Sequence, residues 1–172
     1  MAESYLPSVN GVTMSVVRSM AHLESLGHTV CVLAPRSVGP MPPHAEHLTL
    51  PREVQELRSL ALPRYRSLRV AVPTTREIER AIDQFRPDVV HLAAPALFGG
   101  RVATVCRRRG IPTVAVFQTD LAGFVGNYRG LRSTARPLWR WLRRIHDRAD
   151  LTLAPTPTVA RDLEARGFSP VE

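Results

Sequence analysis

The sequence has few cysteines and no long apolar run. Its 172 residues include only Cys31 and Cys106, which are not arranged as a CxxC pair. We therefore expect two buried free thiols in a reducing cytoplasm, without disulfides or a metal site. No stretch reaches the roughly 18 apolar residues that a membrane span needs, and the N-terminal residues lack the blocks of a signal peptide. The sequence thus predicts a soluble or peripheral protein.

Several nucleotide-binding and hydrolase motifs are also absent. The sequence has no GxGxxG and no GxxxxGK[ST], which argues against a dinucleotide-dependent dehydrogenase and a P-loop ATPase. It has no GxSxG elbow, which argues against a serine hydrolase. His44 and His47 are three residues apart, a spacing too common to predict a metal site.

Acidic residues are outnumbered by basic ones. Lys and Arg total 23 against 15 Asp and Glu, which gives a formal net charge of +8. Such an excess attracts phosphate groups in nucleotides, nucleic acids or anionic lipids, and charge alone does not choose among them.

Strand and helix patterns alternate along the chain. The expected helices span residues 12–26, 74–85, 101–109, 133–149 and 156–166, and the expected strands span 30–33, 68–72, 88–92, 113–117 and 151–154. Residues 35–63 contain six prolines, so we expect a long, mobile surface loop there. This alternation predicts an α/β fold with a Rossmann-like, doubly wound parallel sheet in one domain over residues 1–172.

The two ends suggest a truncated domain. A central apolar strand normally feeds the first helix of such a fold, and no residues before Glu3 supply one. We expect a sheet that lacks its first strand, although a natural start at a helix is the alternative. The sequence also stops soon after Gly167.

Two loops carry candidate binding residues. Asn10 and Gly11 precede the first helix, where backbone N–H groups can face an anion; an ordinary turn glycine with an N-cap is an equal alternative. Gln118, Thr119 and Asp120 follow a strand, where α/β folds place ligand contacts, and a solvent-exposed turn is the alternative. Aromatic residues beside a carboxylate suit a sugar. His91, within an apolar strand, is interpreted as a core histidine.

The segment from Arg132 to Arg148 predicts a basic amphipathic helix. Its arginines suit docking on anionic lipid headgroups, and a core-packed helix with a solvated basic face is the alternative. The residues concerned are Arg136, Arg140, Arg143 and Arg144. A basic nucleic-acid-binding protein is a third alternative, although the aromatic residues do not alternate with the arginines as a stacking platform requires.

The segments 3–13, 26–30, 87–92 and 117–124 together resemble glycosyltransferase family 4. The first and last are similar to the bacterial branch of GDP-mannose-dependent α-mannosyltransferases that act on glycolipids. The resemblance covers essentially the whole chain. It implies the N-terminal, acceptor-side half of a GT-B fold, with the C-terminal donor-binding domain absent.

The resemblance also implies chemistry. A hexose, expected to be mannose, would pass from a nucleotide diphosphate sugar to a lipid-linked hydroxyl with retention of configuration, without a cofactor. Asn10 and Gly11 would lie near the donor diphosphate, and Gln118 and Asp120 would act as catalytic residues. The expected acceptor contacts are Tyr5, Thr119, Phe124 and Tyr128. Relatives carry a second histidine where this chain has Ala93, so no histidine catalyst is expected there.

The implied enzyme would be cytoplasmic and peripheral on the inner face of the membrane, and the isolated chain is predicted to be inactive. A non-catalytic Rossmann-like module that binds an anionic ligand or a membrane surface is the alternative function.

Overall fold

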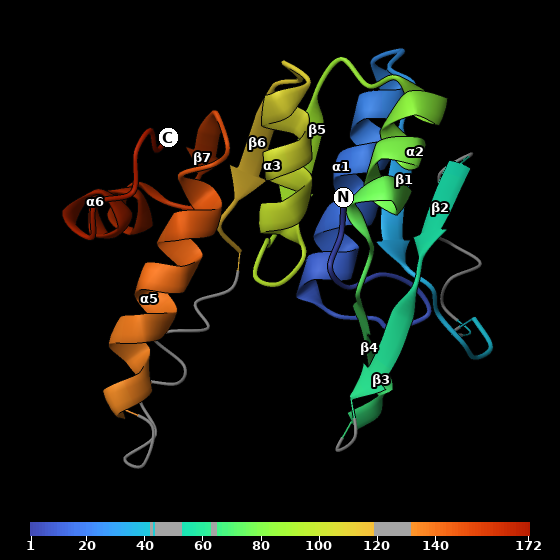
Figure 1. Ribbon diagram of the computed structural model, residues 1–172, viewed down its shortest axis with the longest axis horizontal. Coiled ribbons are helices and arrows are strands. Elements are labelled where there is room, and N and C mark those ends of the chain that lie inside the picture. The colour runs from blue at the N-terminus through green and yellow to red at the C-terminus, as the bar shows by residue number, and fades with distance from the viewer. Residues whose placement is uncertain (42, 44–52, 63–64, 119–131) are drawn as a thin grey trace. The chain divides into compact units, whose positions relative to one another are not determined.

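The computed structural model describes residues 1–41, 43, 53–62, 65–118 and 132–172. These residues divide into two compact units, residues 1–87 and residues 88–172, and each unit is described by itself. Figure 1 labels the helices and strands of both units.

The described residues of the first unit form two helices and four strands. Its elements are α1 (Gly11–Ser25), β1 (Cys31–Pro35), β2 (Glu53–Leu57), β3 (Ser59–Leu62), β4 (Tyr65–Ala71) and α2 (Thr75–Phe85). Strands β1 and β2 pair in parallel, whereas β3 and β4 form an antiparallel hairpin. On β1, the carbonyl of Leu33 accepts a hydrogen bond from the backbone N–H of Ala2 at 2.9 Å.

One face of α1 builds the core of this unit. Val17 and Met20, three residues apart, pack with Val32 and Ala34 of β1, and Tyr5 belongs to the same buried cluster. This spacing places the two apolar side chains of α1 on one side of the helix. The N-terminal segment and the first helix are therefore held on β1 by apolar burial.

The second unit contains a parallel sheet in the order β5-β6-β7. Its elements are β5 (Val90–Ala93), α3 (Gly99–Arg108), β6 (Thr113–Val116), α5 (Arg132–His146), β7 (Leu151–Leu153) and α6 (Pro157–Ala165). Val90 pairs with Thr113, and Val114 pairs with Leu151. Beside β7, Val171 forms a further parallel bridge to Thr152.

The predicted alternation of strands and helices is confirmed. The carboxyl ends of α1, α2, α3 and α6 lie within one residue of the predicted ones, whereas α5 ends at His146, three residues before the predicted end. The chain leaves α1, α3 and α6 through Gly27, Gly110 and Gly167, whose φ angles are 86°, 68° and 83°. Glycine adopts this left-handed conformation without the steric cost that a side chain brings.

The prediction of one loop over residues 35–63 is wrong in its second half, where β2 and β3 lie. The prolines of this region stand at positions 35, 40, 42, 43, 51 and 63, so residues 52–62 contain none. The backbone N–H groups of these residues can therefore donate hydrogen bonds, and those of β2 lie in the ladder that β2 forms with β1. The hairpin of β3 and β4 also departs from the expectation of parallel pairing throughout.

Cys106 is fully buried as expected, whereas Cys31 at the start of β1 is partly exposed; both thiols are free.

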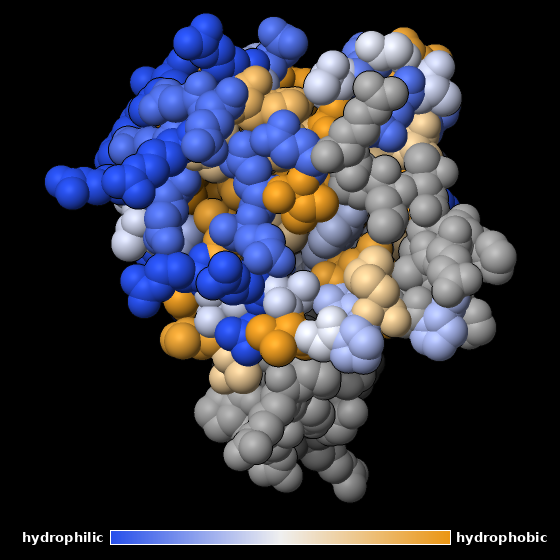
Figure 2. All heavy atoms as spheres, turned by 90° about the vertical axis from the view of Figure 1, so that its right-hand side faces the viewer, coloured by the Kyte–Doolittle hydropathy of each residue, from blue (hydrophilic) through white to orange (hydrophobic). Residues whose placement is uncertain are grey.

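Apolar side chains of other residues reach the surface at several separate places on the face drawn in Figure 2. Among the exposed residues of the first unit are Val9, Leu26, Val38, Val54 and Leu60. Single exposed hydrophobic residues are ordinary on folded proteins. No helix within the described residues is both long enough and apolar enough to cross a membrane.

Helix α2 offers a test of the fold. The hydroxyl of Thr74 accepts the N–H of Glu77 at 3.2 Å, and the Glu77 carboxylate accepts the N–H of Thr74 at 2.7 Å, which is the predicted capping box. We expect Thr74→Ala to lower the free energy of unfolding by about 1 kcal/mol. Urea titration measures the change. The exposed neighbour provides the control, because Thr75→Ala should stay within about 0.5 kcal/mol of the parent. Equal losses in both variants would contradict a capping role for Thr74.

Candidate functional site at the carboxyl ends of β5 and β6

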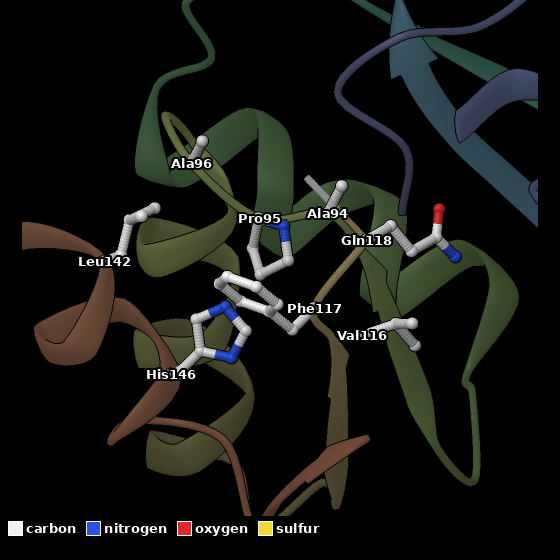
Figure 3. A pocket seen from close by; sticks show the side chains of 8 residues that line it. All are labelled: Ala94, Pro95, Ala96, Val116, Phe117, Gln118, Leu142 and His146. Carbon is white, nitrogen blue, oxygen red and sulfur yellow. The ribbon is translucent and has the colours of Figure 1, made fainter. Parts of the chain in front are cut away.

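A small pocket of the second unit lies where β5 and β6 end. Its accessible volume is about 10 Å³, which is room for about one water molecule. One part of its lining follows the two strands and the other comes from α5, and Figure 3 shows all eight residues: Ala94, Pro95, Ala96, Val116, Phe117, Gln118, Leu142 and His146. Ligand sites of parallel α/β sheets lie at this edge.

Phe117 and Gln118 leave the end of β6 in opposite directions. In Figure 3 the ring of Phe117 lies with Pro95 and His146, whereas the amide of Gln118 points away from them. The cause is the extended backbone, which turns successive side chains to opposite faces. Gln118 is half-buried at the pocket, where the sequence predicted a ligand contact.

An aromatic cluster packs against Phe117 of the pocket. Phe117 stacks on Trp139 of α5 with ring centroids 6.0 Å apart, and Phe168 meets both rings edge to face. The guanidinium of Arg166 lies 4.2 Å from the centre of the Trp139 ring. These contacts fix the position of Phe117 through the packing of α5 and the segment after α6.

His146 is a pocket residue that the sequence analysis missed. Its side chain is 3% exposed, and its Nδ1 lies 3.1 Å from the hydroxyl of Thr152. Burial lowers the pKa of His146 to about 4, so the imidazole is neutral near pH 7. Its place on the apolar side of α5, next to Ile145 and four residues after Leu142, is a signal in the sequence that indicates burial.

The N-terminus of α1, in the first unit, forms a second candidate position. Asn10 is the N-cap as the sequence allowed: its Oδ1 accepts the N–H of Thr13 at 3.0 Å, and its Nδ2 donates to Ser4 at 2.6 Å. The side chain of Asn10 thus makes two hydrogen bonds within the loop. The buried Thr13 donates its hydroxyl to the carbonyl of Ser8 at 2.9 Å, so Ser4 and Thr13 order this turn.

Gly11 is open to solvent at the start of α1. No heavy atom of another residue comes within 4 Å of the place where a Cβ would lie. Within the described part of the chain, no acceptor takes the backbone N–H of Gly11 or Val12. An anion therefore has steric access to unsatisfied donors at this helix end.

The other predicted site residues divide into two groups. Tyr5 lies in the core of the first unit, with its side chain 8% exposed, so little of it is left to contact an acceptor. Within the described residues the buried Tyr5 hydroxyl has no hydrogen-bond partner, and burial raises its pKa to about 12. Thr119, Asp120, Phe124 and Tyr128 lie outside the described residues, and their roles stay predictions.

The exposed side of α5 carries a row of arginines. Arg136, Arg140 and Arg144 are spaced by four residues, are exposed, and form no ion pair with a described carboxylate; we call them the basic row. Arg143, predicted with them, is placed differently, since its Nε lies 3.3 Å from Asp147 and its guanidinium packs on Gly167.

The parallel sheet and the pocket at its edge define a Rossmann-type α/β protein. The model of Glycosyltransferase Family 4 matches residues 9–172, and the chain belongs to that family.

Curated relatives are similar over nearly the whole chain. It is 46% identical over 167 residues to the "GDP-mannose-dependent alpha-mannosyltransferase" of Mycobacterium tuberculosis (strain CDC 1551 / Oshkosh), which covers 97% of this chain and 43% of the relative. The protein of the same name from Mycolicibacterium smegmatis is 45% identical over 164 residues, with coverages of 95% and 43%. The chain therefore spans less than half the length of these relatives.

A solved structure agrees on the fold. The crystal structure of MurG from Acinetobacter baumannii, a GT-B glycosyltransferase, matches with a TM-score of 0.52 at 18% identity and covers 95% of this chain and 40% of MurG. The similarity is consistent with the predicted half of a GT-B fold.

Two histidines, the buried His146 and the partly buried His91, predict a pH dependence of stability. Burial lowers the pKa of His91 to about 4, as it does for His146, from the ordinary 6.5. As pH falls below 6.5 the unfolded chain binds protons that the folded chain does not. Each histidine then lowers the free energy of unfolding by about 1.4 kcal/mol for each pH unit, down to pH 4. We expect His146→Gln to remove roughly half of this loss between pH 6.5 and 5 in urea titrations. An unchanged slope in His146→Gln would contradict a neutral, buried imidazole.

Proposed function

We propose that the chain is the acceptor-side part of a retaining glycosyltransferase that uses GDP-mannose. It would transfer mannose to a lipid-linked hydroxyl. The observation that carries the proposal is the 46% identity to a GDP-mannose-dependent α-mannosyltransferase over 97% of the chain. The donor is a substrate in this proposal, and no metal or other cofactor is invoked.

The donor diphosphate would approach the start of α1. The open space at Gly11 and the unsatisfied N–H groups of Gly11 and Val12 support this position. The side chain of Asn10 bonds to Thr13 and Ser4, so its contribution would be to keep the turn before α1 in place. Backbone N–H groups at a helix N-terminus stabilise the charge that develops on a leaving phosphate.

The acceptor would lie at the pocket after β5 and β6. The pocket is lined mainly by apolar side chains, with Gln118 half-buried at its edge, and it marks the carboxyl ends of β5 and β6, where ligands of parallel sheets bind. In this proposal Asp120, two residues further along the chain, holds or polarises the acceptor hydroxyl. Such a role depends on position more than on a shifted pKa.

We further propose that the exposed face of α5 docks on anionic lipid at the inner surface of the membrane. The basic row supplies charge, and the exposed ring of Trp141 lies on the same helix, one residue after Arg140. Arginine heads beside an aromatic ring are typical of interfacial helices. Arg143 contributes less in this proposal, because Asp147 neutralises it.

A chimera tests the transfer reaction. In it, residues 1–172 replace the matching segment of the M. smegmatis relative, which leaves the rest of that protein in place. We expect the chimera to move radiolabelled mannose from GDP-mannose to a lipid extract and the isolated chain to show no turnover. No transfer by a folded chimera, with the unaltered relative active in the same assay, would contradict the proposed function.

Asp120 is tested in the same chimera. We expect Asp120→Asn to lower kcat about 100-fold or more, the lower range for loss of a positioned acid–base group, while GDP binding by calorimetry stays the same. Asp162→Asn, an exposed change of the same kind on α6, is the control and should leave kcat unchanged. Unchanged turnover of Asp120→Asn at saturating acceptor would remove Asp120 from the mechanism.

Vesicle binding tests the basic row. We expect the chain to bind phosphatidylcholine vesicles only when they contain phosphatidylglycerol. Replacing Arg136, Arg140 and Arg144 with Gln should weaken binding on the order of 100-fold, at about 1 kcal/mol for each arginine. The matched control replaces Arg107, Arg108 and Arg109, which are exposed at the end of α3. Equal weakening by both triple variants would show a general charge effect and contradict a docking face on α5.

A further inference from the structure

Trp141 joins α5 to the segment that follows β5. Its indole Nε1 donates a hydrogen bond to the carbonyl of Ala96 at 2.8 Å, although its side chain is 46% exposed. Leu97, the next residue of that segment, is also exposed. Trp141 therefore lies at the surface and reaches the backbone of a segment that is 45 residues away in the sequence.

The segment 94–98 forms one side of the pocket and has an unusual backbone. Ala94 has a φ of 48°, a conformation that residues with a side chain rarely adopt. Its N–H donates to the carbonyl of Val116 at 3.2 Å, and Pro95 beside it is buried. A residue persists in such a conformation only where its surroundings hold it there.

The opposite side of the pocket comes from the helix that carries Trp141. Leu142 is the next residue along α5, and His146 follows one turn later. The bond from Trp141 to Ala96 thus connects the two sides of the pocket directly. Its length sets how far the carbonyl of Ala96 can move from α5.

We propose that Trp141 is a positioning residue for the candidate acceptor pocket. Its bond to Ala96 holds the segment 94–98 at a fixed distance from α5, and so sets the width of the pocket beside Phe117. Loss of the bond widens the range of positions of that segment without unfolding the unit, because the ring contacts of Phe117 and Phe168 with Trp139 do not involve Trp141. The role in acceptor binding rests on the proposed function. The role in holding the segment 94–98 against α5, which we call the mechanical role, does not.

Amide hydrogen exchange of the chain tests the mechanical role. Trp141→Phe keeps an aromatic ring and removes the N–H donor. We expect exchange in the segment 96–100 to become faster by about 2- to 13-fold, the factor that corresponds to the net contribution of one hydrogen bond. Exchange in β6 and β7 should stay the same.

The other tryptophan of α5 is the matched control. Trp139→Phe changes a ring that packs in the core, so we expect faster exchange throughout the second unit and a lower midpoint of urea unfolding. If Trp141→Phe gives this same uniform pattern, or leaves the segment 96–100 unchanged, Trp141 is not a positioning residue.

Kinetics of the chimera test the link to the acceptor. We expect Trp141→Phe to raise the KM for the lipid acceptor by about the same factor as it raises the rate of amide exchange. Because the bond acts on acceptor binding alone, kcat should stay within about twofold and the KM for GDP-mannose should not change. A fall in kcat without a rise in this KM would overturn the positioning role in the reaction. A parent chimera that transfers no mannose would count against the proposed function, and the exchange pattern would still decide the mechanical role.

Discussion

The parallel pairing of β5, β6 and β7 is the constraint on which the candidate site depends. Parallel strands must be joined by crossovers, so each strand ends at the same edge of the sheet before the chain turns away. This brings Ala94 and Phe117 together although 23 residues separate them. At the other edge, the carboxylate of Asp150 accepts two hydrogen bonds from Thr113, one from its backbone N–H at 2.7 Å and one from its hydroxyl at 3.0 Å. These bonds fix the position at which β6 begins.

Helix α5 links the interior of the second unit to its surface. Leu142, Ile145 and His146 are buried, while the basic row is exposed on the other side. This division is the ordinary consequence of an amphipathic helix beside a sheet. Its functional consequence is specific to this chain, because the helix that would meet a lipid surface also forms one wall of the pocket.

The fold was largely predictable from the sequence because its signals are local. The capping box of Thr74 and Glu77, the glycines at helix ends and the apolar strands each depend on a few neighbouring residues, and all were found. Strands β2 and β3 were missed because their pairing is not local: Glu53 pairs with Cys31, and Ser59 pairs with Ala71. The composition of Glu53–Leu57 is too polar to indicate a strand without its partner.

The candidate site was predictable in part, for a related reason. Gln118 was found because polar residues after a strand are a local signal, and the turn of Asn10 was found because an N-cap is one. His146 and Trp141 act on the pocket through contacts with Thr152 and Ala96, and Ala96 is far away in the sequence. The special backbone of Ala94 has no local signal at all, because alanine normally avoids a positive φ. Packing of the segment around it creates that conformation.

The electrostatic character of the pocket bears on which substrate it would take. A diphosphate requires cations or several N–H donors, since burying its charge without them is strongly unfavourable. The pocket instead has Phe117, Pro95 and Leu142 in its lining, and burial keeps His146 neutral near pH 7. None of these lining side chains carries a charge that could compensate that of a phosphate. The start of α1, with unsatisfied N–H groups and open space at Gly11, has the opposite character. This contrast favours the helix end, and not the pocket, as the position of the donor phosphates.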